Sequence, residues 1–247
     1  MGTKREMNLI KEKWNIQDGK EFNKYLESFK NEEKIEWGRK ILNTQMPVLA
    51  IKTPVIKDIV QNISEGNFYS FLDLELDKYY ENVSINGFLI TKIKEFDLMK
   101  KYLDKYVVKI ENWAACDLLS FDVKKREEKF YNLSLEYIKS NKPFVRRVGL
   151  FLLFNFISND DYIDQVFEIM NQFYEEEHYY VNMMNGWLLC ECFIKRREKT
   201  IKFLKNHKLN KFTINKGISK CRDSYRVSLE DKEMLVIYKQ KNKREVV

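Results

Sequence analysis

Apolar residues recur along this chain at the three- and four-residue spacing of amphipathic helices, almost from end to end. The alternation typical of strands is absent, and only 8 glycines and 3 prolines interrupt the pattern. The sequence therefore predicts an all-α fold with short connections. Helices are expected at about residues 21–29, 33–42, 53 onward, 67–72, 74–80, 85–94, 98–108, 113–121, 122–138, 144–157, 160–173, 178–193, 197–206, 211–222 and 229–239, with a frayed tail at 240–247.

Three of these helix starts are predicted from capping residues. Thr53-Pro54 combines an N-cap hydroxyl with a proline suited to the first helical position. Ser84 and Asp122 are expected to cap the helices at 85–94 and 122–138.

Many helices of similar length, joined by short linkers, suggest stacked helical hairpins. The intervals support this: Trp113 to Gly149 is 36 positions, Gly149 to Gly186 is 37, and Arg147 to Trp187 is 40. We expect a HEAT-like helical-repeat solenoid with a concave basic groove, formed by residues 1–247 as one domain. Self-similarity between the repeats is poor, so a non-repetitive helical domain is the alternative.

The charge and the apolar content of the chain indicate which kinds of partner it could bind. The chain has 44 basic and 37 acidic residues, a formal charge of +7, which favours polyanions through long-range attraction. Much of this charge is also what solvated helix faces carry. No run of about 18 uncharged apolar residues occurs, so no membrane contact and a cytoplasmic location are expected. Nothing in the sequence demands more than a monomer.

The sequence motifs of several common metal sites and enzyme active sites are absent from this chain. The four cysteines form no CxxC pair and are expected to be reduced and mostly buried, so neither a metal nor a disulfide framework is expected. The phosphate-binding loops, HExxH and GxSxG are absent as well, and no cofactor is expected. His178 and His207 are the only histidines, and each is more easily explained as a surface or capping residue than as a catalyst.

Trp113 and Asp117 stand four residues apart at an expected helix start, so both side chains should project from one face. The simpler interpretation is that Trp113 packs between repeats and Asp117 caps or pairs locally. A carboxylate beside an aromatic face is also an arrangement that stabilises a neighbouring positive charge.

Three further features are candidates for function. Arg146 and Arg147 interrupt an apolar helix near its N-terminus, where the helix dipole disfavours cations, so a phosphate or an internal carboxylate such as Asp117 should compensate one of them. Gly186 precedes Trp187 in mid-helix and predicts close approach of a backbone or a ligand, although Trp187 could simply be core. Lys195-Arg196-Arg197 is either a binding edge or a solvated rim.

Four short motifs together resemble the DNA alkylation repair family of HEAT-like glycosylases, the AlkD type. They are Ala50-Ile51-Lys52-Thr53-Pro54, Asn112-Trp113-Ala114-Ala115-Cys116-Asp117, Val145-Arg146-Arg147 and Gly186-Trp187. The resemblance covers about residues 35–239. Ala50 stands where the family has glycine, the segment after Asp117 is more apolar than expected, and the chain before residue 35 matches little.

The resemblance implies a monofunctional glycosylase that removes positively charged alkylpurines, of the 3-methyladenine and 7-methylguanine type, from double-stranded DNA without flipping the base. It implies that Asp117 is the catalytic carboxylate, that Trp113 and Trp187 are aromatic walls against the deoxyribose, and that Arg147 binds a backbone phosphate. Arg146 and Lys195 are further candidate DNA contacts.

The chemistry is consistent with a lone carboxylate. A purine alkylated at N3 or N7 is cationic and leaves as a neutral base, so no general acid is needed, whereas the sugar becomes oxocarbenium-like and needs a nearby anion. Two alternatives remain on the same scaffold: a non-catalytic binder of DNA structure and a protein-interaction solenoid.

Overall fold

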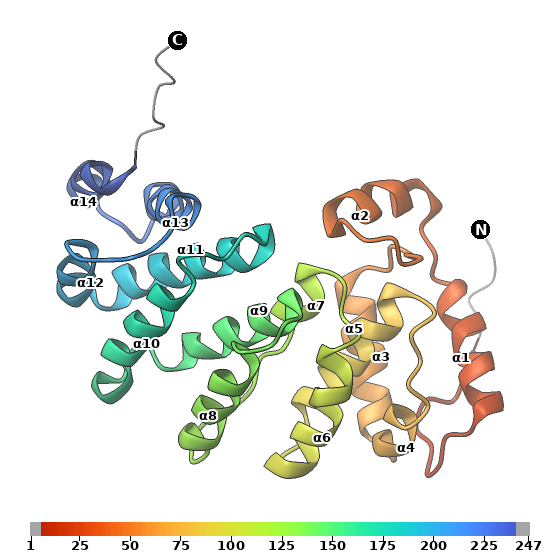
Figure 1. Ribbon diagram of the computed structural model, residues 1–247. Helices are drawn as coiled ribbons and strands as arrows, with labels where there is room; N and C mark the ends of the chain where they lie inside the picture. Colours follow the sequence, from red (N-terminus) through yellow and green to blue (C-terminus); the bar gives the residue numbers. More distant parts are fainter. Residues whose placement is uncertain (1–5, 241–247) are drawn as a thin grey trace. The chain divides into compact units, whose positions relative to one another are not determined.

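The computed structural model describes residues 6–240, and within them every regular element is a helix. Figure 1 shows helices following one another with short connections. The predicted all-α, helical-repeat fold class is confirmed. None of the described helices is both long and apolar enough to cross a bilayer.

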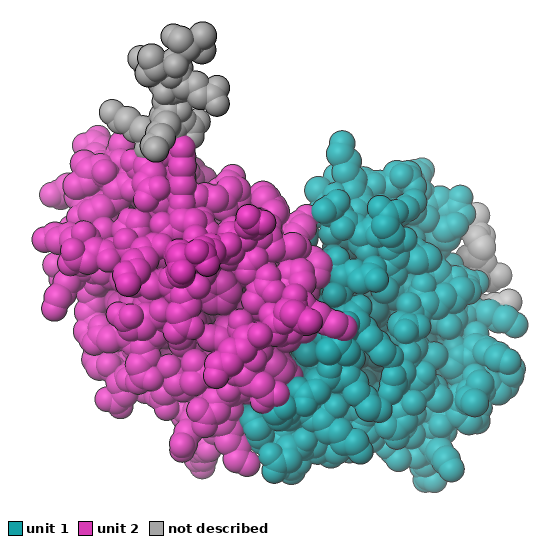
Figure 2. Space-filling model, viewed as in Figure 1, with its two compact units in different colours: residues 1–122 teal, residues 123–247 magenta. Residues whose placement is uncertain are grey.

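The chain divides into two compact units, residues 1–122 and 123–247, which Figure 2 shows in separate colours. That the whole chain acts as one domain therefore stays a prediction. The first unit contains α1 (Ile16–Glu27), η1 (Glu32–Lys34), α2 (Ile35–Leu42), α3 (Thr53–Ser64), α4 (Phe68–Leu72), α5 (Tyr80–Thr91), α6 (Phe96–Val107) and α7 (Trp113–Asp117).

The second unit contains longer helices arranged as packed neighbours. Its elements are α8 (Glu127–Tyr137), α9 (Pro143–Leu152), η2 (Leu153–Asn155), α10 (Asp160–Gln172), α11 (Tyr179–Lys195), α12 (Arg197–Leu204), α13 (Lys211–Asp223), α14 (Leu229–Met234) and η3 (Leu235–Tyr238). Helix α11 lies between α9 and α13, and α8 and α12 pack against α9 and α11 respectively. This is the repeated pairing expected of helical hairpins.

The first unit has a well-packed aromatic core that includes residues before position 35, where the sequence was expected to match the family little. Trp14, Phe22 and Phe71 are buried, and the Phe71 ring meets the other two edge to face at centroid distances of 4.9 and 5.0 Å. Burying such side chains contributes about 1.5–3 kcal/mol each. The early helices therefore form a real hydrophobic core.

All three capping predictions are wrong. Helix α3 begins at Thr53 itself, with Lys52 at the N-cap position and no side-chain capping bond, although Pro54 does lie in the first turn. For the other two helices, the local backbone explains the difference. No helix covers 74–80: α5 begins only at Tyr80, where the Asn82 side chain accepts the Tyr79 backbone N–H at 2.9 Å. Ser84 is therefore inside α5, and its hydroxyl donates to the Tyr80 carbonyl. Asp122 is not the N-cap of α8, because α8 starts at Glu127 with Arg126 at the N-cap position, after Lys125 takes a left-handed φ of 63°.

The chain ends differ from expectation at one described residue. Gln240 exchanges two hydrogen bonds with the Asn215 side chain, at 2.9 and 3.0 Å, so it is held rather than frayed. The rest of the expected tail, 241–247, lies outside the described residues.

Candidate active site

Helix α7 is a single turn that carries Trp113 at its start and Asp117 at its end. The buried Asn112 caps it, accepting the Ala115 backbone N–H at 3.0 Å. The helix is shorter than the predicted 113–121, because the chain leaves the helical conformation after Leu118. Both side chains are half-buried, so each keeps an exposed part on the surface of the first unit.

Trp113 is fixed by a hydrogen bond to a distant helix. Its indole N–H donates to the backbone carbonyl of Ile41, at the end of α2, over 3.1 Å. That carbonyl is one of those left without an intrahelical partner at a helix C-terminus. The bond ties α7 to α2 and orients the ring of Trp113.

A buried tyrosine, Tyr106, holds α7 in position through a hydrogen bond to its backbone. The Tyr106 hydroxyl donates to the Ala115 carbonyl at 2.9 Å, and burial raises the pKa of Tyr106 well above its usual value. A Cβ on Gly87 of α5 would lie 2.7 Å from this hydroxyl and 2.5 Å from the Leu118 side chain. Only glycine therefore lets α5 approach the Tyr106 hydroxyl and Leu118 this closely.

The negative charge of Asp117 affects the pKa of the neighbouring Tyr80 side chain. Burial raises the pKa of Tyr80, at the first position of α5, and the negative charges of Glu81 and Asp117 raise it further. Tyr80 therefore stays protonated at neutral pH beside Asp117.

The loop before α3 is held by a buried carboxylate. Glu81 is 2% exposed and accepts the backbone N–H groups of Leu49 and Ile51 at 3.0–3.2 Å. Between them Ala50 has a left-handed φ of 56°, a conformation that glycine adopts at less cost than alanine. Burial raises the pKa of Glu81 even though these N–H groups favour its ionised form.

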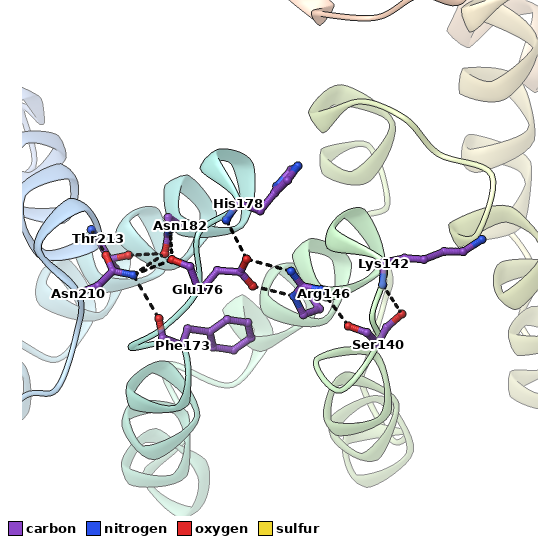
Figure 3. A network of polar contacts seen from close by, with 9 residues as sticks. All are labelled: Ser140, Lys142, Arg146, Phe173, Glu176, His178, Asn182, Asn210 and Thr213. Carbon is purple, nitrogen blue, oxygen red and sulfur yellow. Dashed lines mark hydrogen bonds and ion pairs between the residues drawn. The ribbon is translucent and has the colours of Figure 1, made fainter.

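In the second unit, Arg146 is engaged in an internal ion pair. Its guanidinium binds the Glu176 carboxylate through two hydrogen bonds of 2.7 and 2.9 Å and donates to the Ser140 carbonyl, as Figure 3 shows. Burial disfavours the ionised form of Glu176, but Arg146 and the His178 backbone N–H outweigh it and lower the pKa of Glu176. The sequence predicted that a phosphate or an internal carboxylate would compensate Arg146 or Arg147. For Arg146, that partner is the carboxylate of Glu176.

A polar network continues from Glu176 to α13. The Glu176 carbonyl accepts the side-chain amides of Asn182 and Asn210, and the Asn182 side-chain oxygen also accepts from Asn210 and the Thr213 hydroxyl (Figure 3). These bonds join α11 to α13 through buried polar groups. Each buried partner in such a network costs stability if it is removed.

Arg147 is buried, with 5% exposure, and its guanidinium donates to the Tyr180 backbone carbonyl of α11. Sequence reasoning identified an unusual arginine here but not that it would lie so deep.

Trp187 belongs to a half-exposed aromatic cluster on the second unit. Its ring centroid lies 4.9 Å from that of Phe154 and 6.3 Å from that of Phe151, and the Lys220 ammonium group lies 5.7 Å from the ring. A cation over an indole is attracted to its face. The ring is thus partly packed and partly available.

Gly186 marks a close helix contact, as predicted. A Cβ at this position would lie 3.1 Å from the Gly217 backbone nitrogen and 3.1 Å from the Thr213 carbonyl oxygen, both in α13. The two alternatives left by the sequence were a backbone and a ligand, and the contact is with a backbone.

The basic run at the end of α11 divides into paired and exposed members. Arg196 donates to the Ile157 and Ser158 carbonyls, and Arg197 binds the Asp231 carboxylate at 2.6–3.0 Å. Lys195 is exposed. The run is therefore mostly a structural edge, in which Lys195 and the ion-paired Arg197 both face solvent.

Glu81, Tyr106 and Glu176 position the candidate residues, and none of the three was predicted from the sequence. A charged residue within an apolar helix, as at Glu81, was the one available signal. None of the four cysteines is in a disulfide, and all four are buried. Over the described part of the chain, no three His, Cys, Asp or Glu side chains form a group that could hold a metal ion.

Comparison with known families gives one match. Residues 22–221 match the family model described as DNA alkylation repair enzyme, which spans the candidate residues of both units. Comparison with curated proteins gives no significant match.

Proposed function

Because the chain belongs to the family of DNA alkylation repair enzymes, we propose that it is a monofunctional DNA glycosylase for positively charged alkylpurines of the 3-methyladenine and 7-methylguanine type. The observation that carries the proposal is helix α7, which presents Trp113 and Asp117 half-exposed on a rigid support. Catalytic groups need such fixed positions to act on a transition state.

In the proposed reaction, the N-glycosidic bond breaks and its electron pair moves to the cationic purine, which leaves neutral. The deoxyribose becomes oxocarbenium-like, and the carboxylate of Asp117 stabilises that charge. A water molecule, oriented by the same carboxylate, adds to C1′ and loses a proton to solvent. The products are a free base and an abasic site, and the reaction consumes only water.

The two tryptophans have proposed supporting roles. The faces of Trp113 and Trp187 attract positive charge and would favour the sugar cation. The Trp113 ring is held by Ile41 and the Trp187 ring by Phe154, so neither needs to be ordered during the reaction. We further propose that the base stays in the stack, which fits a lesion whose own charge activates it.

Phosphate contacts would supply most of the affinity. Among the candidates, Lys195 is exposed and offers its ammonium group directly, so it is the first proposed contact. Arg147, which is buried and donates to the Tyr180 carbonyl, is proposed as a second contact because the family resemblance implies that role. A contact by Arg146 would have to share its guanidinium with Glu176.

The experiment is incubation of the purified protein with duplex DNA methylated by an alkylating agent, followed by chromatography of the released bases. Release of 3-methyladenine or 7-methylguanine, with no strand cleavage before alkali, is the expected result. Salt-sensitive binding without any release would support a non-catalytic binder, and the absence of both would support a protein-interaction role.

A further inference from the structure

Helix α2 exposes the side chains that an amphipathic helix normally buries. Trp37 is 65% exposed and Ile41 is 49% exposed, and Leu42 is the buried residue of the helix. Trp37 and Ile41 are four residues apart, so they project from the same face. An exposed tryptophan and isoleucine side by side form an apolar patch, which is more informative than either alone.

This face adjoins α7. The Ile41 carbonyl accepts the indole N–H of Trp113, so the exposed Ile41 and the half-buried Trp113 are neighbours within one unit. Trp37 lies one helical turn, about 6 Å, further along α2. An apolar strip therefore runs from Trp113 through Ile41 to Trp37.

The surroundings of the strip carry a small excess of cations. From residue 32 to 52, which covers η1, α2 and the loop that packs back on α2 at Gly38, there are four cations and three carboxylates, a net charge of +1. The carboxylates are Glu32 and Glu33, which precede α2, and Glu36, which lies 3.5 Å from the guanidinium of Arg39. The cations are Lys34, Arg39, Lys40 and Lys52.

We propose that the face of α2 formed by Trp37 and Ile41 is a DNA-binding surface that contacts the duplex next to the lesion. Proteins that bind nucleic acids present aromatic and aliphatic side chains to the bases and sugars, and place Lys and Arg against the phosphates on either side. The inference rests on the proposed function, because it places the damaged nucleotide at Trp113. Ile41 contacts Trp113, and the ~6 Å from Ile41 to Trp37, laid along the duplex at about 3.4 Å per base pair, spans about two steps.

The test uses a duplex with a tetrahydrofuran abasic analogue, which needs no excision to bind. Trp37→Ala should weaken binding about tenfold in fluorescence anisotropy, Ile41→Ser should weaken it less, and Trp37→Phe should restore most of the affinity. The matched control is Ile16→Ala, which truncates another exposed side chain of the same unit, 75% exposed, and should bind as the wild type does. Thermal midpoints should be unchanged, because both residues face solvent.

A second readout does not depend on the variants. With the wild-type protein, 2-aminopurine two steps from the abasic analogue should change its fluorescence on binding, whereas 2-aminopurine eight steps away should not. Equal responses at both positions, wild-type affinity in Trp37→Ala, failure of the wild type to bind the duplex, or a dimer that Trp37→Ala dissociates would each overturn the inference.

The two proposals fail separately. Tight, Trp37-dependent binding without release of methylated bases removes the proposed activity and leaves the surface in place. If release depends on Asp117, and Trp37→Ala changes neither release nor binding, the proposed surface is wrong and the proposed activity stands.

Discussion

Gly149 of α9 lies directly against the backbone of Ile138 at the end of α8: a Cβ on Gly149 would be 2.8 Å from the Ile138 nitrogen and 2.7 Å from its side chain. Since real Cβ atoms do not approach this closely, one of the two helices would have to shift. The same reasoning applies, less severely, to Gly186 against Gly217. Gly149 and Gly186, which are 37 positions apart, thus each allow a close approach between helices of the second unit.

Gly149→Ala should therefore destabilise the protein. Overpacking should cost more than the gain of about 1 kcal/mol in helix propensity, for a net loss of about 2 kcal/mol in the free energy of unfolding. Gly38→Ala is the matched control, because its Cβ would meet Val48 at an ordinary 3.5 Å and the change should be neutral or stabilising. Thermal and urea unfolding measure both. Equal effects of the two substitutions would contradict the packing explanation.

Glu75 should make stability depend on pH. Hydrogen bonds from the ammonium groups of Lys105 and Lys109, at 2.8 and 2.6 Å, lower the pKa of Glu75 from 4.5 to about 2. A lowered carboxyl pKa stabilises the fold above the unfolded value, and this contribution is lost as pH falls from about 4.5 towards 2. Because Glu75 is 38% exposed, the contribution should stay below about 1 kcal/mol.

The measurement is the difference in unfolding free energy between the wild type and Glu75→Gln, followed from pH 7 downward. This difference should shrink below about pH 4.5. In a Lys105→Gln/Lys109→Gln background it should be small at every pH. A difference that grows on acidification would contradict the assignment.

Arg146→Gln should cost stability because it leaves the Glu176 carboxylate buried without its partner. The two side chains are 18% and 9% exposed, and breaking such a pair typically costs about 3 kcal/mol. Adding Glu176→Gln should recover part of the loss, giving a coupling of at least about 1 kcal/mol in a double-mutant cycle. Additive losses in urea unfolding would show that the pair is not coupled.

Lys195→Gln should alter DNA binding and leave stability unchanged. Removing one phosphate contact should reduce the slope of log affinity against log salt by about 1. Lys199→Gln makes the same change of charge, but Lys199 already pairs with Asp164 at 2.9 Å and should leave the slope as it is. Identical slopes for the two variants would rule out a specific contact by Lys195.

Local periodicity and short motifs predicted much of this molecule. The helical pattern identified nearly every helix, and the landmarks around Trp113, Arg147 and Gly186 indicated the family that residues 22–221 match. Glycine inside a helix lowers helix stability, and this cost at Gly186 correctly predicted a close neighbour. The prediction needed only the local sequence.

What the sequence did not predict depends on contacts between distant residues. Glu176 lies 30 positions from Arg146, and Glu81 lies about 30 from the loop that it holds, so no local pattern reports either contact. The start of α5 was misplaced for a related reason. Capping by Asn82 competes with the more obvious Ser84, and only the packing of the surrounding chain decides between them.

The central claim is that the carboxylate of Asp117 stabilises the sugar cation, and Asp117→Asn tests it most directly, because the amide keeps the shape and removes the charge. Release of methylated purines should fall at least about a hundredfold, with the thermal midpoint and duplex affinity close to those of the wild type. Asp104→Asn, a surface substitution in the same unit, should release bases normally. Wild-type rates of release by Asp117→Asn would contradict the account.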